Sequence, residues 1–411
     1  MPTYLAPDVY VEEVAGGARP IEAVGTSTAG FVGVAPDPTA HLNKAVAINN
    51  WTQFAKEYIP EDGKSTPLSH AVFGFFQQGG SLCYVVNVGK DQSIAGGGRQ
   101  RTGLDVLEQI DEIAIVVAAG YTDAASYDAV LSHCERLQDR VAILDAPGVV
   151  PDLNLLTQVA TAQAGPSAGG GGTGAPPGAS AGGSAEAGLR PRQSDGGYGA
   201  FYFPWITVRD PLSPNNLVNV APSGHLAGIW ARTDAIRGVH KAPANESIRE
   251  ALNVTYRLTR AEQEELNRAG VNCIRFFSTE GVRVWGARTL AGSSSEWRYL
   301  NVRRLVNMIK ESIADSTRWI VFEPNDETLW KSIRRDVTAF LTLLWRNGAL
   351  MGRTPEAAFF VKCDEETNPP ENIDAGIVTT LIGIAPVKPA EFVVFRISQH
   401  TGGTQTEIQG G

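Results

Sequence analysis

The chain has 411 residues, 43% hydrophobic side chains and a formal net charge of −9 at neutral pH. That length is enough for two or three modest domains with buried cores. The acidic balance argues against general nucleic-acid binding, which needs a basic surface. Apolar runs such as 113–119 are too short to span a bilayer, and the first residues lack the basic and apolar regions of a signal peptide. We therefore expect a chain that folds in a cytoplasm, without membrane insertion.

The sequence carries no recognisable reaction centre. It lacks a phosphate-binding loop, a zinc-protease helix motif and a nucleophile elbow. Asp145 ends a predicted strand, which is a frequent place for a ligand site, but a turn ahead of Pro147 explains a lone carboxylate equally well. Four single cysteines have neither metal-ligand nor redox spacing, and we expect them to be reduced core residues: Cys83, Cys134, Cys273 and Cys363. We predict no catalytic, cofactor or metal site.

Residues 1–22 are predicted to form an extended N-terminal arm. Leu5, Val9 and Val11 fall on one face of a strand, and the prolines nearby argue against a helix. Twenty extended residues could reach about 66 Å, far enough to touch another molecule. The alternative is an edge strand of the chain's own sheet.

Residues 23–285 alternate strand and helix signals. Strands are predicted at 31–34, 45–48, 83–88, 113–117 and 141–144, with helices at 51–58, 68–78 and 123–138. This order predicts an α/β domain built on a mixed, doubly wound sheet. A Gly-rich stretch at 165–188 has one charge and no large side chain, so we expect a flexible loop at 165–194, with a domain linker as the alternative. Strand signals return at 198–208.

The rest of the chain is predicted to form a smaller α+β domain, 286–388, and a C-terminal arm, 389–411. Ahead of this domain, helices are expected up to 235, up to 252 and at 261–269, with a strand pair at 273–277 and 282–285. Two amphipathic helices follow at 297–313 and 328–347, then strands at 376–384 and 391–399. In the last strand, one face is predicted to carry Val393, Phe395 and Ile397, and the other Phe392 and Val394.

Several ordered segments carry a family resemblance. They include Phe203-Pro204-Trp205-Ile206, Pro222-Ser223-Gly224-His225-Leu226, Gly238-Val239-His240-Lys241, Val284-Trp285-Gly286-Ala287-Arg288, Trp297-Arg298-Tyr299-Leu300-Asn301 and Lys388-Pro389-Ala390-Glu391-Phe392. Together they resemble the contractile tail sheath proteins of bacteriophages, R-type pyocins and extracellular contractile injection systems. The resemblance covers residues 198–400 in detail and extends to the N-terminus through Gly30-Phe31-Val32-Gly33.

The resemblance implies a structural protein without enzymatic activity. It implies hexameric rings that stack helically around an inner tube protein, with a baseplate and a terminator or cap protein as further partners. It also implies assembly in a bacterial cytoplasm, into a phage tail or an extracellular particle. The terminal arms would be exchanged between subunits by strand addition, and contraction from a metastable extended state would drive the tube. Pairing of the arms within the chain is the alternative.

The inner-tube contact is predicted on the second amphipathic helix. Residues 297–348 carry nine basic and six acidic side chains, in contrast to the acidic chain as a whole. Lys331 and Arg335 lie opposite the apolar stripe of this helix, with Arg334 beside them. An acidic tube surface would fit this basic face, and an ordinary solvated helix face is the alternative. Two other functions remain open at this point, a non-contractile tail tube or filament protein and an α/β hydrolytic enzyme.

Overall fold

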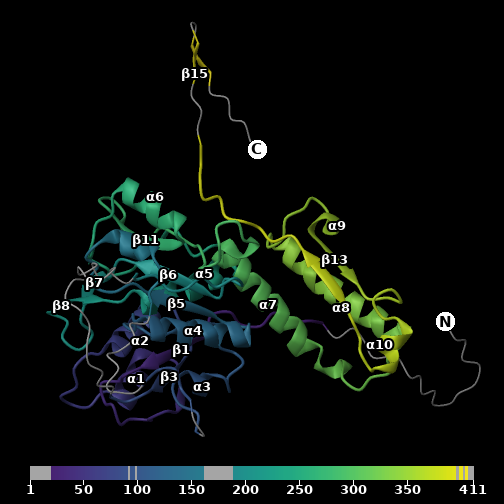
Figure 1. The fold of residues 1–411 in the computed structure, drawn as a ribbon, viewed down its shortest axis with the longest axis horizontal. Coiled ribbons are helices and arrows are strands. Elements are labelled where there is room, and N and C mark those ends of the chain that lie inside the picture. The colour runs from purple at the N-terminus through teal and green to yellow at the C-terminus, as the bar shows by residue number, and fades with distance from the viewer. Residues whose placement is uncertain are drawn as a thin grey trace, which may run out of the picture. The chain divides into compact units, whose positions relative to one another are not determined.

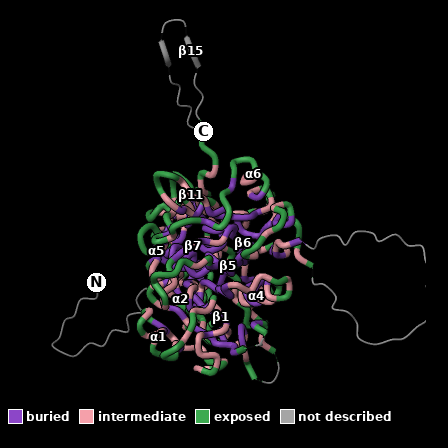
Figure 2. The backbone as a smooth tube through the Cα atoms, turned by 90° about the vertical axis from the view of Figure 1, so that its left-hand side faces the viewer, coloured by how far each residue is buried: buried purple, intermediate pink, exposed green. Residues whose placement is uncertain are grey.

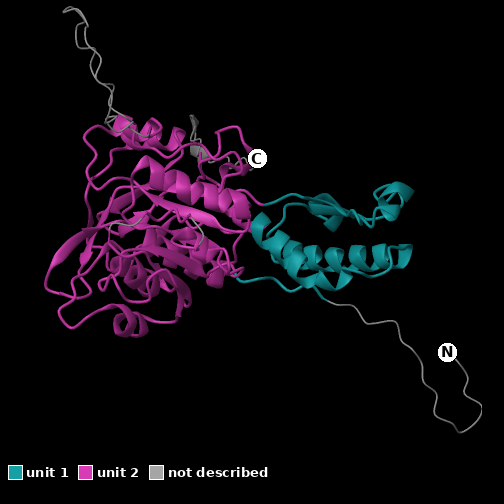
Figure 3. Cartoon of the chain, turned by 60° about the horizontal axis from the view of Figure 1, so that its bottom comes forward, with its two compact units in different colours: residues 1–25, 306–386 teal, residues 26–305, 387–411 magenta. Residues whose placement is uncertain are grey.

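The computed structural model describes residues 20–90, 93–97, 100–161, 188–394, 398–400 and 403–405 (Figure 1). The predicted arm residues Leu5, Val9 and Val11 lie outside the described residues, as do 165–187 of the Gly-rich stretch. The fold is of mixed α/β class, as the sequence predicts. Contacts divide the chain into two compact units (Figure 3). The large unit comprises residues 26–305 and 387–411, and the small unit comprises residues 1–25 and 306–386.

A nine-stranded sheet organises the large unit. Its strands lie in the order β2-β3-β1-β4-β5-β6-β11-β12-β9, and the six from β3 to β11 run parallel to one another. Strands β2, β12 and β9 pair antiparallel at the two edges. The bounds are β1 Ala29–Gly33, β2 Ala45–Ile48, β3 Cys83–Asn87, β4 Ile115–Val117, β5 Val141–Asp145, β6 Gly199–Phe203, β9 Glu246–Ser247, β11 Val271–Phe277 and β12 Gly281–Val284.

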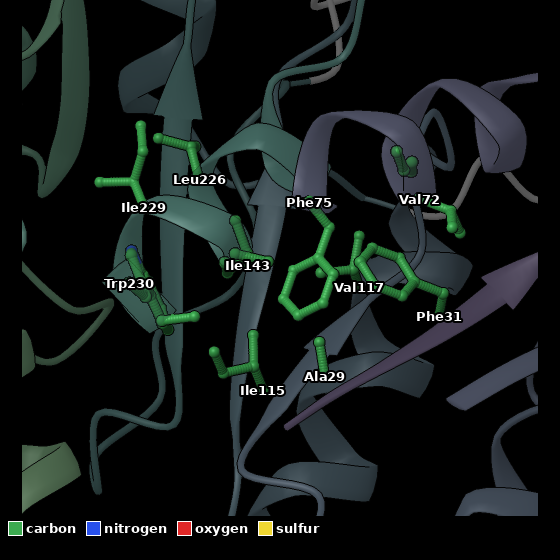
Figure 4. Close-up of a cluster of buried hydrophobic side chains, with 14 of the residues drawn as sticks. Ala29, Phe31, Val72, Phe75, Ile115, Val117, Ile143, Leu226, Ile229 and Trp230 are labelled. Atoms are coloured by element: carbon green, nitrogen blue, oxygen red, sulfur yellow. The ribbon is translucent and has the colours of Figure 1, made fainter. Parts of the chain in front are cut away.

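The central strands are buried on both faces (Figure 2). Successive residues of a strand point to opposite sides, so Phe31 joins one apolar cluster and Val32 the other. The first cluster gathers Phe31, Phe75 and Trp230 between the sheet and helices α2 and α5 (Figure 4). The second lies against the opposite face. The helices of the large unit are α1 Trp51–Tyr58, α2 Pro67–Gln78, α3 Leu104–Leu107, α4 Ala124–Leu137, α5 Ser223–Arg237 and α6 Arg260–Arg268, with 3₁₀ turns η1 Leu153–Thr157 and η2 Glu296–Arg298.

Local sequence explains where these helices begin and end. Thr66 and Ser69 form a reciprocal capping box at the start of α2, and Gly79 ends the helix in the left-handed region. The Asp123 side chain accepts a hydrogen bond from the Ser126 amide and caps α4.

Glycine allows α2 and α5 to approach closely. A Cβ atom at Gly224 would lie 2.2 Å from the Ala71 Cα, and one at Gly228 would lie 2.3 Å from the Phe75 carbonyl oxygen. Any larger residue at either position would push the two helices apart.

Two sequence predictions for the large unit need correction. The helix expected up to residue 252 is absent from the described chain after Arg237, where Gly238 adopts a φ of 91° and Pro243 follows. The strand expected at 198–208 is two strands, β6 and β7 Ile206–Arg209, separated at Pro204. Strand β7 pairs with β8 Leu217–Val220 and β10 Asn253–Val254 in a separate three-stranded sheet.

The small unit is built from helices and a two-stranded sheet. Helix α7, Leu300–Ser316, begins in the large unit and continues into the small one. The further elements are η3 Arg318–Ile320, α8 Glu327–Arg346, α9 Pro355–Ala358, β13 Phe359–Lys362, α10 Pro370–Asp374 and β14 Leu381–Ile384. Near its end the chain forms a separate antiparallel pair, β15 Ser398–His400 with β16 Gly403–Gln405.

Candidate assembly site

The root of the C-terminal arm is attached to the large unit by side chains. The carboxylate of Glu391 accepts hydrogen bonds from Arg288 Nε and Nη2, both at 2.8 Å, in a bidentate pair. It also accepts from Asn267 Nδ2 at 2.9 Å and from the Tyr299 hydroxyl at 3.2 Å. Four residues earlier, the carbonyl of Val387 accepts a hydrogen bond from Asn301 Nδ2 at 3.0 Å. Residues 387–391 are therefore held against the large unit.

Arg288 is itself fixed before it meets Glu391. Its backbone amide donates to Asn272 Oδ1 at 2.7 Å, and its carbonyl accepts from Asn272 Nδ2 at 2.7 Å. Its Nη1 donates to the Asn267 carbonyl at 2.8 Å. The Arg288 and Glu391 side chains are only 11% and 21% exposed, so water competes weakly for this pair. Burial alone would raise the pKa of Glu391, but the bonds from Arg288 and Asn267 outweigh it and lower the pKa.

The three residues after Glu391 have exposed apolar side chains. Phe392, Val393 and Val394 are 74%, 70% and 77% exposed. The strand predicted at 391–399 is wrong over 391–394, which form no regular structure because their backbone pairs with none of the strands that the structure describes. Phe395 and Ile397 lie outside the described residues. Consecutive exposed large apolar residues are unusual on a surface that faces water.

A groove of about 530 Å³ lies beside this root, within the large unit. Its apolar wall includes Trp285, Ala287 and Tyr299, and residues 389–393 form part of its rim. Trp285 is 39% exposed, and its ring lies 4.9 Å from that of Phe277.

The small unit presents an incomplete sheet. In β13 and β14, Phe360 is opposite Gly383 and Lys362 is opposite Leu381, so these four residues share one face. On that face Phe360 and Leu381 are 54% and 52% exposed, whereas Phe359 on the other face is buried. Among the described residues, β13 and β14 pair only with each other, which leaves the outer edge of each strand unpaired. Strand β13 was not predicted from the sequence, although the apolar run 359–361 is a strand signal.

The predicted tube-contact residues lie on the exposed face of α8. Lys331 pairs with Glu327 at 2.7 Å, and Arg335 pairs with Asp336 at 2.9 Å. Within the described chain Arg334 forms no ion pair. The predicted apolar stripe on the other face is buried throughout: Leu329, Ile333, Val337, Phe340, Leu341 and Leu344.

An acidic segment lies next to this basic face. Lys331 and Arg334 line a groove of about 290 Å³ together with Asp364, Glu365 and Glu366. The basic character of the α8 face is therefore partly compensated within the small unit.

Asp145 has a structural role instead of forming the suggested turn. It is buried at the end of β5, and it accepts hydrogen bonds from the Ser223 amide at 2.9 Å and the Ser223 hydroxyl at 2.5 Å. It thus binds the N-terminus of α5, and burial raises the pKa of its carboxyl to about 7. His225, fully buried in the next turn, has its pKa lowered by burial to about 3.

Cysteine and metal chemistry find no site in the described chain. All four cysteines are buried and unpaired, and burial raises the pKa of the Cys134 thiol, which disfavours the reactive thiolate. Among the residues described, no three His, Cys, Asp or Glu side chains gather as metal ligands. The helices that the structure describes include none with the length and hydropathy to cross a membrane.

Comparison with known families gives two adjacent matches. The phage tail sheath protein central domain matches residues 193–290, and the phage tail sheath C-terminal domain matches residues 293–400. Together these ranges cover just over half of the chain.

Individual sequences agree with the family matches. The tail sheath protein of Vibrio phage KVP40 is 29% identical over 46% of this chain and 28% of its own length. A putative prophage major tail sheath protein of Pseudomonas aeruginosa is 28% identical over 47% of this chain and 49% of its own length. The matches thus span half or less of these relatives.

Solved structures match over nearly the whole chain. The sheath complex of the extracellular contractile injection system PVC, in its contracted state, has a TM-score of 0.75 at 27% identity and covers 98% of this chain and 99% of that one. The contracted helical sheath of the anti-feeding prophage has a TM-score of 0.74 at 27% identity and covers 97% of this chain and all of that one. The chain therefore belongs to the contractile tail sheath family, whose members are structural proteins and not enzymes.

Proposed function

We propose that this chain is the sheath subunit of a contractile, phage-tail-like injection machine. It polymerises as stacked hexameric rings around an inner tube and contracts to drive the tube through a target envelope. The observation that carries the proposal is the C-terminal arm. Its root is fixed by Glu391, and the three apolar residues that follow have no partner within the described chain. The near-complete similarity to two contracted sheaths supports the same function.

The arm would complete the sheet of a second copy. The β13–β14 sheet has two unpaired edges and one exposed apolar face, which is what an added strand requires. In that arrangement, main-chain hydrogen bonds give affinity, and Phe392, Val393, Val394, Phe395 and Ile397 set the register. Leu5, Val9 and Val11 of the N-terminal arm would extend the same sheet. If each subunit gives its arm to one neighbour and receives an arm from another, the contact is head-to-tail, and such a contact propagates as a helical filament where its rotation does not close.

Contraction would proceed by rigid-body movement of subunits that stay joined through their arms. The extended sheath is the kinetic trap and the contracted sheath the state of lower free energy. The two-sided core of the large unit suits such a movement, since close-packed interiors transmit force without deforming. The energy is stored at assembly, so no nucleotide is required.

The working parts that we propose follow the sequence boundaries. They are an N-terminal arm at 1–22, a doubly wound α/β domain at 23–285, a tube-facing domain at 286–388 and a C-terminal arm at 389–411. Partners would be the inner tube, the baseplate and a terminator or cap protein, with assembly in a bacterial cytoplasm before use in a tail or an extracellular particle. The baseplate structure of the anti-feeding prophage, which also matches this chain, supports the baseplate partner.

The tube would be held by Lys331, Arg334 and Arg335. All three are exposed on α8, and Arg334 is the most available because its charge has no ion-pair partner among the described residues. An electrostatic contact of exposed groups weakens with salt, so tube release between about 0.1 and 1 M NaCl is expected. Tube binding that is unchanged over this range would remove these residues from the proposal.

Electron microscopy of the purified full-length chain tests the function. Hollow tubes or stacked rings, wide enough to enclose an inner tube, are expected, and deletion of residues 389–411 should abolish them. Persistent monomers, both alone and when co-expressed with the tube protein, would contradict the proposal. Tubes that still form after the deletion would refute arm exchange while leaving polymerisation intact.

A further inference from the structure

The last part of the polypeptide crosses back from one unit to the other. The chain enters the small unit within α7, leaves it after Pro386, and from Val387 onward belongs again to the large unit. Across residues 387–394 no backbone–backbone hydrogen bond is formed with any described residue. The attachment of this segment therefore depends on the Asn301 contact at its start and the Glu391 contact at its end.

The contact of Glu391 is stronger than that between Asn301 and Val387. Its two oxygens receive four hydrogen bonds from three side chains, and two of these bonds come from the charged guanidinium of Arg288. The donors come from separate parts of the large unit: Asn267 from α6, Arg288 from the segment after β12, and Tyr299 from the residue before α7. Such a convergent set fixes both the position and the direction of the residue it holds.

We propose that Glu391 is a positioning residue for assembly, which fixes the point at which the C-terminal arm leaves the large unit and so presents the arm to a second copy of this chain. This inference rests on the proposed sheath function. Without the Glu391 contact, the five residues 387–391 would be free to move. At about 3.4 Å per residue, this segment would allow the base of the arm to move over roughly 17 Å.

Restricting the movement of the base of the arm raises the effective concentration of the arm at its docking site. Tethered binding is strongest when the tether matches the distance it must span and weakens as the attachment loosens. Pre-organisation also lowers the ordering cost at the moment of docking. The exposed residues Phe392 to Val394 follow the anchor directly, so the anchor acts on the first apolar residues of the arm.

The test compares Glu391→Gln with Glu61→Gln in the full-length chain. The first substitution keeps the size of the side chain and removes its charge, whereas Glu61 is an exposed residue of the large unit that serves as the matched control. Two measurements are made, the NMR order parameters of the backbone over residues 390–394 in the unassembled protein, and the lowest protein concentration at which tubes form. In E391Q we expect the order parameters to fall and the critical concentration to rise about tenfold, with E61Q unchanged.

Two further variants separate positioning from general stability. Glu391→Asp keeps the charge on a shorter side chain and should fall between the wild type and E391Q. The double variant Arg288→Glu with Glu391→Arg restores an ion pair in the opposite sense but loses the bonds from Asn267 and Tyr299, so it should assemble better than Arg288→Glu alone and less well than the wild type. Thermal unfolding of the E391Q large unit should stay close to that of the wild type, because the apolar core is untouched.

Each outcome decides a different claim. Unchanged order parameters at 390–394 in E391Q would show that Glu391 does not anchor the arm. Lower order parameters with an unchanged critical concentration would overturn its role in assembly. A wild-type protein that never assembles would count against the sheath function itself, whereas the order parameters would still decide the anchor.

Discussion

The nine-stranded sheet and the β13–β14 sheet differ in how complete they are. The nine-stranded sheet of the large unit is covered on both faces, and its central strands are buried throughout. The β13–β14 sheet has two strands, one covered face and one exposed face. A two-stranded sheet is marginal by itself and needs further strands or a packing partner.

This difference separates folding from assembly. The large sheet satisfies its own backbone and apolar surface, so substitutions there should act on the free energy of unfolding. The small sheet leaves edges and apolar side chains available, so substitutions there should act on polymer formation.

The largest effect is expected from Trp230→Ala in the large unit. Trp230 is 0% exposed, and its removal leaves a cavity beneath the sheet, so the free energy of unfolding should fall by about 3–5 kcal/mol. Denaturation in guanidinium chloride measures it. Trp285→Ala is the matched control, because that ring is 39% exposed and should cost far less. Equal losses for the two variants would contradict the assignment of the core.

Lowering the pH is expected to have an intermediate effect on the free energy of unfolding. Burial lowers the pKa of His225 to about 3, and neither ring nitrogen has a hydrogen-bond partner in the described structure. Below the unfolded pKa of about 6.5, the imidazole is protonated in the unfolded chain but stays neutral in the folded one. The free energy of unfolding is therefore highest above pH 6.5 and decreases as the pH falls towards 3. At pH 5 the loss should be about 2 kcal/mol.

The variant His225→Gln isolates this contribution. The Asp145 carboxyl changes in the opposite sense, because its pKa is raised to about 7 and its protonated form is favoured on folding. The difference between wild type and H225Q is therefore the quantity to measure. That difference should shrink by about 2 kcal/mol between pH 7 and pH 5, and a constant difference would mean that His225 is accessible to solvent.

The smallest effect on folding is expected from Phe360→Ser combined with Leu381→Ser. Both side chains are about half exposed on the open face of the small sheet, so the free energy of unfolding should change by less than about 0.5 kcal/mol per substitution. Tube formation, followed by sedimentation, should nevertheless be lost or strongly weakened. Leu343→Ser, at an exposed position on α8, is the control and should assemble normally. Normal assembly of the double variant would place the docking surface elsewhere.

The sequence predicts elements well where local signals suffice. The strand at 45–48 and the helix at 51–58 have the predicted bounds, because apolar spacing and the cap at Asn50 act over a few residues. The helix expected up to 252 is wrong because Gly238 and Pro243 outweigh the apolar pattern.

The assembly site could be predicted only in part. The apolar alternation of the arm is visible in sequence, but over 391–394 it does not produce a strand, since a strand needs a partner and none lies beside this segment among the described residues. The anchor of Glu391 could not be found this way. Its main partner Arg288 is 103 positions away, and only the folded chain brings the two together.

That separation along the chain also sets an order of events during synthesis. At about 5–20 residues per second, the ribosome needs roughly 5–20 s to pass from Arg288 to Glu391, a separation of 103 residues. During this interval most of the large unit has been synthesised, whereas Glu391 and the C-terminal arm that follows it have not. If the arm joins subunits as proposed, a nascent chain would be unable to offer it to finished subunits, which would protect polysomes from premature polymerisation through that arm.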